Sequence, residues 1–321
     1  MRSRPASTPR SGRWRTPWRC CCDGQRSTVD SQPEPPPLTA SGLDERTTER
    51  IVRGVTLFER RVGDGPPTVV LHGGPGAHHD YLRPGFDRLA RRRTLIHYDQ
   101  RGGGRSPVSR ETPVGWREHV EDLEALRGLW GVERLAVAGY SWGALLALLY
   151  ALEHPDRVDR LGLVSPAPVW LGARAEFERR LAKRNAAPEV EAARREARER
   201  NLGDGNVEEY RRRMFELSVA GYFHDWRRAR ELTPFRITGR TQQEVWESLG
   251  DFDLRPRLAG LAVPAVILHG EDDPIPMETT EALARILRAP LHRLPACGHV
   301  PYIEAPEAFT AILDEFLPRE G

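Results

Sequence analysis

The most informative stretch of the chain is Gly-Tyr-Ser-Trp-Gly at residues 139–143. Residues 135–138 precede it as a short apolar run typical of a strand, and residues 144–152 follow it with the pattern of a helix. A serine between two glycines at such a strand–turn–helix junction is typical of a nucleophile elbow. The turn is strained there, and the glycines remove Cβ atoms that would collide across it. The motif predicts that Ser141 projects from the carboxyl edge of a sheet, toward a helix N-terminus. An ordinary tight turn is the alternative interpretation.

Short apolar segments alternate with longer amphipathic ones on both sides of this motif. Such alternation implies an α/β fold, with a doubly wound, mostly parallel sheet and helices on both of its faces. The pattern predicts strands at 54–62, 68–72, 93–98, 135–138, 160–164, 264–268 and 291–294, and helices at 80–92, 116–130, 145–152 and 308–317.

Residues 167–247 break this alternation because they contain no strand pattern. The stretch 179–200 reads as one highly charged helix with Glu191/Arg195 and Glu196/Arg200 at i,i+4 spacing, and a second helical run starts at Val207. We interpret 167–247 as a helical cap inserted after the sixth strand, between two core segments at 46–166 and 248–321. A solvated helical appendage is the alternative.

Composition excludes several classes of protein. Of the 321 residues, 39% are hydrophobic, which suffices for a sizeable core and excludes wholesale disorder. No apolar run approaches the roughly 20 residues of a membrane helix, so we expect no membrane association. Residues 1–35 carry a net charge of +4 in a chain whose formal net charge is +2. The body is therefore slightly acidic, and nucleic acid is not an expected partner.

Residues 1–45 are expected to be a disordered, basic N-terminal extension. The segment is rich in Arg, Ser and Pro and cannot bury enough apolar surface to offset its chain entropy. It lacks the apolar stretch of a secretory signal; a transit peptide, or translation from too early a start codon, are alternatives. Three cysteines lie at 20–22 without a second Cys/His cluster nearby, so we expect no metal site and no disulfide framework. Cys297 alone remains in the body, which fits a cytoplasmic protein.

A base for Ser141 must come from a loop at the same edge of the sheet, because a serine hydroxyl alone is a poor nucleophile. His299 fits, since it follows the strand at 291–294 and precedes the final helix. Asp273 follows the strand at 264–268 and would orient that imidazole, with neighbouring Asp272 as its close competitor. Such placement is lacking for five other histidines: His78, His79, His154, His224 and His292.

The segment 72–76 reads His-Gly-Gly-Pro-Gly and follows the central strand. Glycines let backbone N–H groups approach a developing oxyanion without steric cost. We assign an oxyanion hole to the N–H groups of Gly74 and Trp142. A phosphate cradle is the alternative, but the glycine patterns of nucleotide-binding loops do not occur in the chain.

Together these segments resemble the α/β-hydrolase superfamily, and more narrowly the proline iminopeptidase (prolyl aminopeptidase) family. The narrower resemblance rests on 72–76, on 139–143 and on 99–106, which reads Asp-Gln-Arg-Gly-Gly-Gly-Arg-Ser. It covers about residues 50–318, and the chain order serine, aspartate, histidine is that of the superfamily. The segment 99–106 is expected to be a structural loop near the site without a chemical role.

The resemblance implies a helical cap whose carboxylates bind the free amino group of an N-terminal proline. Such a group needs a fixed negative partner once it leaves water. Glu216 is our first choice for this carboxylate, with Glu209 and Glu231 as competitors. Exposed helix charges are the alternative for each of the three. Tyr140 stands where a glycine is common in the family, so the peptidase assignment stays open at this point.

We therefore expect a serine hydrolase that works by acyl transfer and needs no metal or organic cofactor. The leading substrate is a small peptide from which the enzyme, as an aminopeptidase, releases N-terminal proline or another small residue. One alternative is a carboxylesterase or amidase acting on small acyl substrates with no amine requirement. The other is a non-catalytic protein of the same fold that binds a small ligand or a partner.

Overall fold

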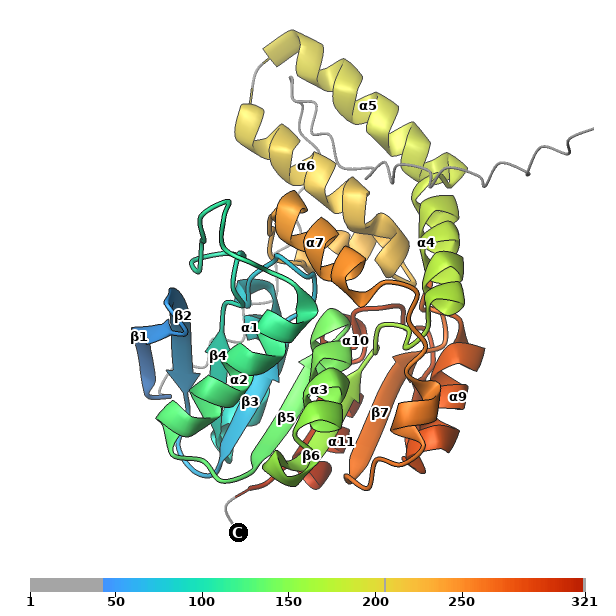
Figure 1. The fold of residues 1–321 in the computed structure, drawn as a ribbon. Helices are drawn as coiled ribbons and strands as arrows, with labels where there is room; N and C mark the ends of the chain where they lie inside the picture. The colour runs from blue at the N-terminus through green and yellow to red at the C-terminus, as the bar shows by residue number, and fades with distance from the viewer. Residues whose placement is uncertain (1–42, 205, 320–321) are drawn as a thin grey trace, which may run out of the picture.

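The computed structural model describes residues 43–204 and 206–319, which form one sheet with helices on both faces (Figure 1). The eight strands lie in the order β1-β2-β4-β3-β5-β6-β7-β8. β2 pairs antiparallel with β1 and β4, and all other neighbouring pairs are parallel. The predicted doubly wound, mostly parallel sheet is confirmed. The strands are β1 (Glu45–Val52), β2 (Val55–Val62), β3 (Pro67–Leu71), β4 (Thr94–Tyr98), β5 (Leu135–Tyr140), β6 (Val158–Val164), β7 (Ala265–Gly270) and β8 (Leu291–Leu294).

Alternate residues of the central strands pack into two apolar cores, one on each face of the sheet. In β5, Val137 belongs to one core and Ala138 to the other. Because both faces are covered, β5 is buried along its whole length, which fixes the place where its carboxyl end emerges. The first core is covered by α2 (Trp116–Trp130), α3 (Trp142–Glu153), α8 (Arg255–Leu258) and α9 (Met277–Leu287), and the second by α1 (Arg83–Phe86), α10 (Pro301–Glu304) and α11 (Pro306–Phe316).

The single helix predicted at 80–92 is wrong, because the structure has three short pieces there. Pro84 has no N–H to continue the preceding turn and instead lies in the first turn of α1. A Cβ at Gly85 would lie 2.5 Å from the Cβ of Tyr302, so this turn packs closely against α10. The 3-10 helices of the described chain are η1 (Asp80–Leu82), η2 (Asp87–Arg91), η3 (Pro155–Arg157), η4 (Ala220–Tyr222) and η5 (Trp226–Glu231).

A helical insertion lies between β6 and β7, beyond the carboxyl ends of the strands, as the sequence predicts (Figure 1). It contains α4 (Leu171–Asn185), α5 (Pro188–Asp204), α6 (Val207–Val219) and α7 (Gly239–Leu249), with η4 and η5 between α6 and α7. Figure 1 shows α5 and α6 side by side and projecting away from the sheet. α7 packs against α2, and its Trp246 ring contacts that of Trp142 at the start of α3. The division into core segments at 46–166 and 248–321 and a cap at 167–247 stays a prediction.

The continuous helix predicted over 179–200 is interrupted between α4 and α5. Pro188 begins α5, and the residue before a proline is disfavoured in the helical conformation. The expected pair of Glu196 with Arg200 is present at 2.5 Å. Glu191 pairs with Arg194 instead of Arg195.

The start of the chain needs one correction. Residues 1–42 of the expected extension lie outside the described residues. Glu45, its last residue, is the first residue of β1, a strand that the sequence analysis did not predict. Among the described residues, no helix combines the length and the apolar character needed to cross a bilayer.

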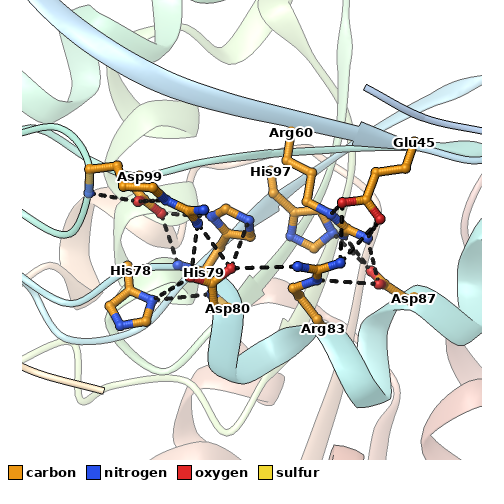
Figure 2. A network of polar contacts seen from close by, with 10 residues as sticks. Glu45, Arg60, His78, His79, Asp80, Arg83, Asp87, His97 and Asp99 are labelled. Atoms are coloured by element: carbon orange, nitrogen blue, oxygen red, sulfur yellow. Dashed lines mark hydrogen bonds and ion pairs between the residues drawn. The ribbon is translucent and has the colours of Figure 1, made fainter. Parts of the chain in front are cut away.

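Several histidines are buried inside the core domain. Figure 2 shows His97 close to Arg60 and Asp87, in a polar network between the sheet and the segment around α1. Burial lowers the pKa of His97 and of His72 to about 4, and that of His119 to about 3. These three imidazoles are therefore neutral in the folded protein at physiological pH.

This burial predicts acid-sensitive stability. Unfolding returns each of the three imidazoles to an ordinary pKa near 6.5, so the unfolded chain binds more protons below that pH. The stability that goes with the neutral, buried imidazole is fully present above pH 6.5 and is lost as the pH falls toward 4. At pH 5 the loss amounts to about 2 kcal/mol for each histidine. Urea unfolding should give a clearly lower free energy at pH 5 than at pH 7. The exposed His292 serves as control, since His292→Gln should leave this difference unchanged; equal stability at both pH values would contradict the account.

Candidate active site

Ser141 occupies the turn between β5 and α3 in a strained backbone conformation. Its φ is +53° and its ψ is −116°, which a residue with a Cβ rarely adopts. A Cβ at Gly143 would lie 2.1 Å from the Leu71 carbonyl oxygen, and one at Gly139 would lie 2.6 Å from the Gly143 carbonyl oxygen. Only glycines at both positions let the turn close against β3. The strand–turn–helix setting expected from the motif is present.

Three predicted side chains form one hydrogen-bonded chain. His299 follows β8 and places its Nε2 3.0 Å from Ser141 Oγ. Its Nδ1 lies 2.9 Å and 3.1 Å from the two carboxylate oxygens of Asp273, in the loop after β7. The backbone N–H of His299 also donates to the Tyr222 carbonyl, at 2.6 Å. The three strands end at one edge of the sheet, which brings together loops far apart in sequence.

Asp273, and not Asp272, is the acid that contacts His299. Burial alone would raise the pKa of the Asp273 carboxyl, but the imidazoles of His299 and His269 and the Ile275 N–H keep that pKa below its ordinary value. The carboxylate is therefore ionised and suited to hold an imidazolium. Asp272 is half exposed and pairs with His224 Nδ1 at 2.8 Å.

The glycine-rich loop 72–76 packs directly against the serine. A Cβ at Gly73 would lie 3.3 Å from the Cβ of Ser141, and Gly74 has a φ of +127°, a conformation that favours glycine. Within the described part of the chain, the backbone N–H groups of Gly74 and Trp142 donate to no protein acceptor. Both predicted donors are thus free to bind an oxygen of a substrate.

Aromatic rings enclose the His299 imidazole. Tyr222 stacks on it with ring centroids 5.0 Å apart, and Tyr140 and Phe177 lie at 5.3 Å and 6.0 Å. Tyr140 ends β5, Phe177 belongs to α4 and Tyr222 ends η4. Core and cap therefore both contribute to an apolar wall, which limits the access of water to His299.

The three cap carboxylates expected from the sequence do not contact the site around Ser141. Glu216 is largely buried but bonded to Arg212 at 3.3 Å and Arg213 at 3.0 Å. With Glu209 it lines a hollow of about 320 Å³ between α5 and α6, to which Ser141, His299 and Asp273 do not contribute. Glu231 pairs with Arg228 at 2.8 Å. The structure gives none of the three glutamates a contact with Ser141, His299 or Asp273.

A different cap carboxylate, Glu178, belongs to α4 and directly follows Phe177, whose ring contacts His299. Burial and the charges of Asp273 and Glu178 together raise the pKa of Tyr222. Arg174 holds Glu178 at 2.7 Å, and the Arg174 guanidinium lies 3.8 Å above the ring of Trp246. Sequence reasoning missed Glu178 because it is one of many charges on α4. The only signal was Phe177, an aromatic residue within a charged helix.

Glu304 is a second residue that the sequence analysis missed. Its carboxylate accepts the N–H of Gly298 at 2.7 Å and that of His224 at 2.9 Å. Gly298 precedes His299, and His224 belongs to the insertion. The carboxylate therefore ties the His299 loop to the cap segment after η4.

The comparisons with known proteins agree with this architecture. Residues 66–306 match the family described as the alpha/beta hydrolase fold, and the chain belongs to this family. The predicted α/β-hydrolase fold is confirmed. The chain is similar to the proline iminopeptidase of Heyndrickxia coagulans, with 28% identity over 277 residues that cover 79% of this chain and 91% of the relative.

Two further relatives match a similar share of the chain. The proline iminopeptidase of Lactobacillus helveticus (strain DPC 4571) is 28% identical over 285 residues, which cover 83% of this chain and 95% of the relative. A crystal structure of a proline iminopeptidase-related protein from Thermus thermophilus has 27% identity and a TM-score of 0.63. That likeness covers 85% of this chain and 96% of the other. The predicted resemblance is confirmed, and fold, family and relatives support hydrolase activity.

Proposed function

We propose that the protein is a serine aminopeptidase that releases N-terminal proline or another small residue from peptides. The observation that carries the proposal is the continuous chain of hydrogen bonds from Ser141 through His299 to Asp273. The names of the similar proteins support the choice of an N-terminal proline.

In the proposed mechanism, His299 acts first as a base. Its Nε2 takes the proton of Ser141 Oγ as this oxygen attacks the carbonyl carbon of the substrate. The N–H groups of Gly74 and Trp142 stabilise the tetrahedral oxyanion. Asp273 holds the imidazole in the tautomer that has its proton on Nδ1 and stabilises the imidazolium that forms.

The second half of the reaction releases the acyl group. His299 gives its proton to the leaving nitrogen, the amide bond breaks, and an acyl-enzyme remains on Ser141. His299 then takes a proton from water, which attacks the ester, and Ser141 recovers its proton when the acid product leaves. The aromatic wall around His299 limits competing access of water to the imidazole.

Recognition of a free amino group requires a carboxylate beside the site. We assign this role to Glu178, because it directly follows Phe177, whose ring contacts His299. Its partner Arg174 also packs over the ring of Trp246, which contacts the ring of Trp142. Its pairing with Arg174 would hold the carboxylate in place for the amine. Glu216, our first choice from the sequence, instead lines the hollow between α5 and α6, to which Ser141, His299 and Asp273 do not contribute.

Glu178→Gln should raise KM for L-proline p-nitroanilide by about 10- to 100-fold, since a charge-assisted hydrogen bond contributes roughly 1.5–3 kcal/mol. The kcat/KM for p-nitrophenyl acetate should stay within about twofold, because that ester has no amine. Glu209→Gln, on the exposed start of α6, is the matched control and should leave the kinetic constants for both substrates unchanged. If Glu178→Gln impairs both substrates equally, Glu178 is not the amine site.

The test of the function itself compares three substrates on the wild-type enzyme. L-proline p-nitroanilide should be cleaved with a much higher kcat/KM than its N-acetyl derivative, since acylation removes the charged amine. Cleavage of p-nitrophenyl acetate without any cleavage of the anilide would overturn the aminopeptidase assignment and leave a carboxylesterase or amidase.

A further inference from the structure

We propose that Gln100 is a positioning residue for the oxyanion hole. It belongs to the segment 99–106, for which the sequence analysis expected no chemical role. The inference rests on the proposed function, since it concerns the N–H donors of Gly74 and Trp142. In this role Gln100 does not touch the substrate, but it fixes the positions of the two backbone N–H donors.

The side chain of Gln100 joins two loops through both ends of its amide. Its Nε2 donates to the His72 carbonyl at 2.9 Å, and its Oε1 accepts the indole Nε1–H of Trp142 at 2.8 Å. The backbone N–H of Gln100 also donates to His72 Nε2 at 3.0 Å. The residue is 1% exposed, so water cannot replace these bonds.

His72 completes the arrangement. Since its Nε2 accepts the Gln100 N–H, its proton is on Nδ1, which lies 2.7 Å from the Gly73 carbonyl. His72 is two residues before Gly74, and Trp142 supplies the other proposed donor. Three loops, after β3, β4 and β5, are thus connected through one buried amide.

The loop that carries Gln100 is itself anchored on both sides. Figure 2 shows the neighbouring Asp99 beside His79. The Asp99 carboxylate lies 2.7 Å from His79 Nδ1 and accepts the Arg105 backbone N–H at 2.9 Å. On the other side, Thr241 of α7 donates to the Gly102 carbonyl at 2.9 Å. The loop around Gln100 therefore has anchors of its own, which do not involve the oxyanion hole.

An oxyanion hole stabilises the transition state more than the bound substrate. Misaligned N–H donors should therefore lower kcat more than they raise KM. Gln100→Met keeps the length of the side chain but removes both amide hydrogen bonds. We expect kcat for p-nitrophenyl acetate to fall by about 10- to 100-fold with KM within about threefold. Affinity for a phenylboronic acid, which forms a tetrahedral adduct on serine, should fall by a similar factor.

Thr241→Val is the matched control. It releases the same loop from α7 but leaves the bonds of Gln100 to His72 and Trp142 in place. This variant should lose thermal stability to a similar extent with kcat within about twofold of wild type. Trp142→Phe removes the same hydrogen bond from the other side and should lower kcat as well, which keeps the proposal testable if Gln100→Met does not fold.

The outcomes distinguish a failure of the proposed role of Gln100 from a failure of the proposed function. If Gln100→Met and Trp142→Phe fold and keep wild-type kcat and boronic acid affinity, Gln100 has no positioning role. Equal losses in Gln100→Met and Thr241→Val would likewise reduce it to a structural residue. If the wild-type protein hydrolyses neither L-proline p-nitroanilide nor the ester and does not bind the boronic acid, the proposed function itself fails.

Discussion

Ser141→Ala is expected to reduce kcat/KM by about 10⁵-fold or more on any substrate that the wild-type enzyme cleaves. Without Oγ there is no atom 3.0 Å from His299 Nε2 to attack the carbonyl, and only the oxyanion donors and substrate binding remain. The measurement is kcat/KM on L-proline p-nitroanilide with protein purified away from host peptidases.

Ser218→Ala is the control for this variant. The Ser218 hydroxyl donates to the Phe215 carbonyl within α6 and is not bonded to Ser141, His299 or Asp273, so its removal should change kcat/KM by less than about twofold. Activity of Ser141→Ala above about 1% of wild type would mean that another group is the nucleophile.

Asp273→Asn should lower kcat by about 10⁴-fold while leaving the fold intact. The amide cannot stabilise the imidazolium, and its NH₂ group favours the His299 tautomer that lacks a proton on Nδ1. The adjacent substitution Asp272→Asn offers a matched comparison one residue away. It loses a half-exposed pair with His224 and should keep kcat within a few-fold of wild type.

These two variants also decide between Asp273 and Asp272 as the acid that holds His299, a choice that the sequence alone left open. A large loss in Asp272→Asn together with an active Asp273→Asn would contradict the geometry around His299. Circular dichroism and thermal unfolding of both proteins provide the necessary check that each variant is folded.

The central sheet could be predicted because its strands are apolar and end in glycine-containing loops. β5 and α3 are the clearest case, since every residue of β5 is buried and the turn between them requires two glycines. β1 could not be recognised, because Glu45–Val52 is polar and mostly exposed. It is a strand only through its pairing with β2.

The predicted site residues fall into two groups for a physical reason. Ser141, Asp273 and His299 each lie in the turn or loop that follows a strand, so the topology of the sheet determines their meeting point. A cap glutamate has no such constraint, because the direction in which a helix faces depends on tertiary packing. Glu216 and Glu178 both stand on charged helices, yet Glu216 pairs with two arginines of α6, whereas Glu178 directly follows Phe177, whose ring contacts His299.

Covalent labelling tests the central claim, that Ser141 is the nucleophile, most directly. The wild-type protein would be treated with a fluorophosphonate and digested, and the adduct located by mass spectrometry. We predict one adduct per chain, on Ser141, formed in parallel with the loss of activity and much more slowly in Asp273→Asn. An unmodified Ser141 in protein that still hydrolyses its substrate, or an inactivating adduct on another residue, would contradict the account.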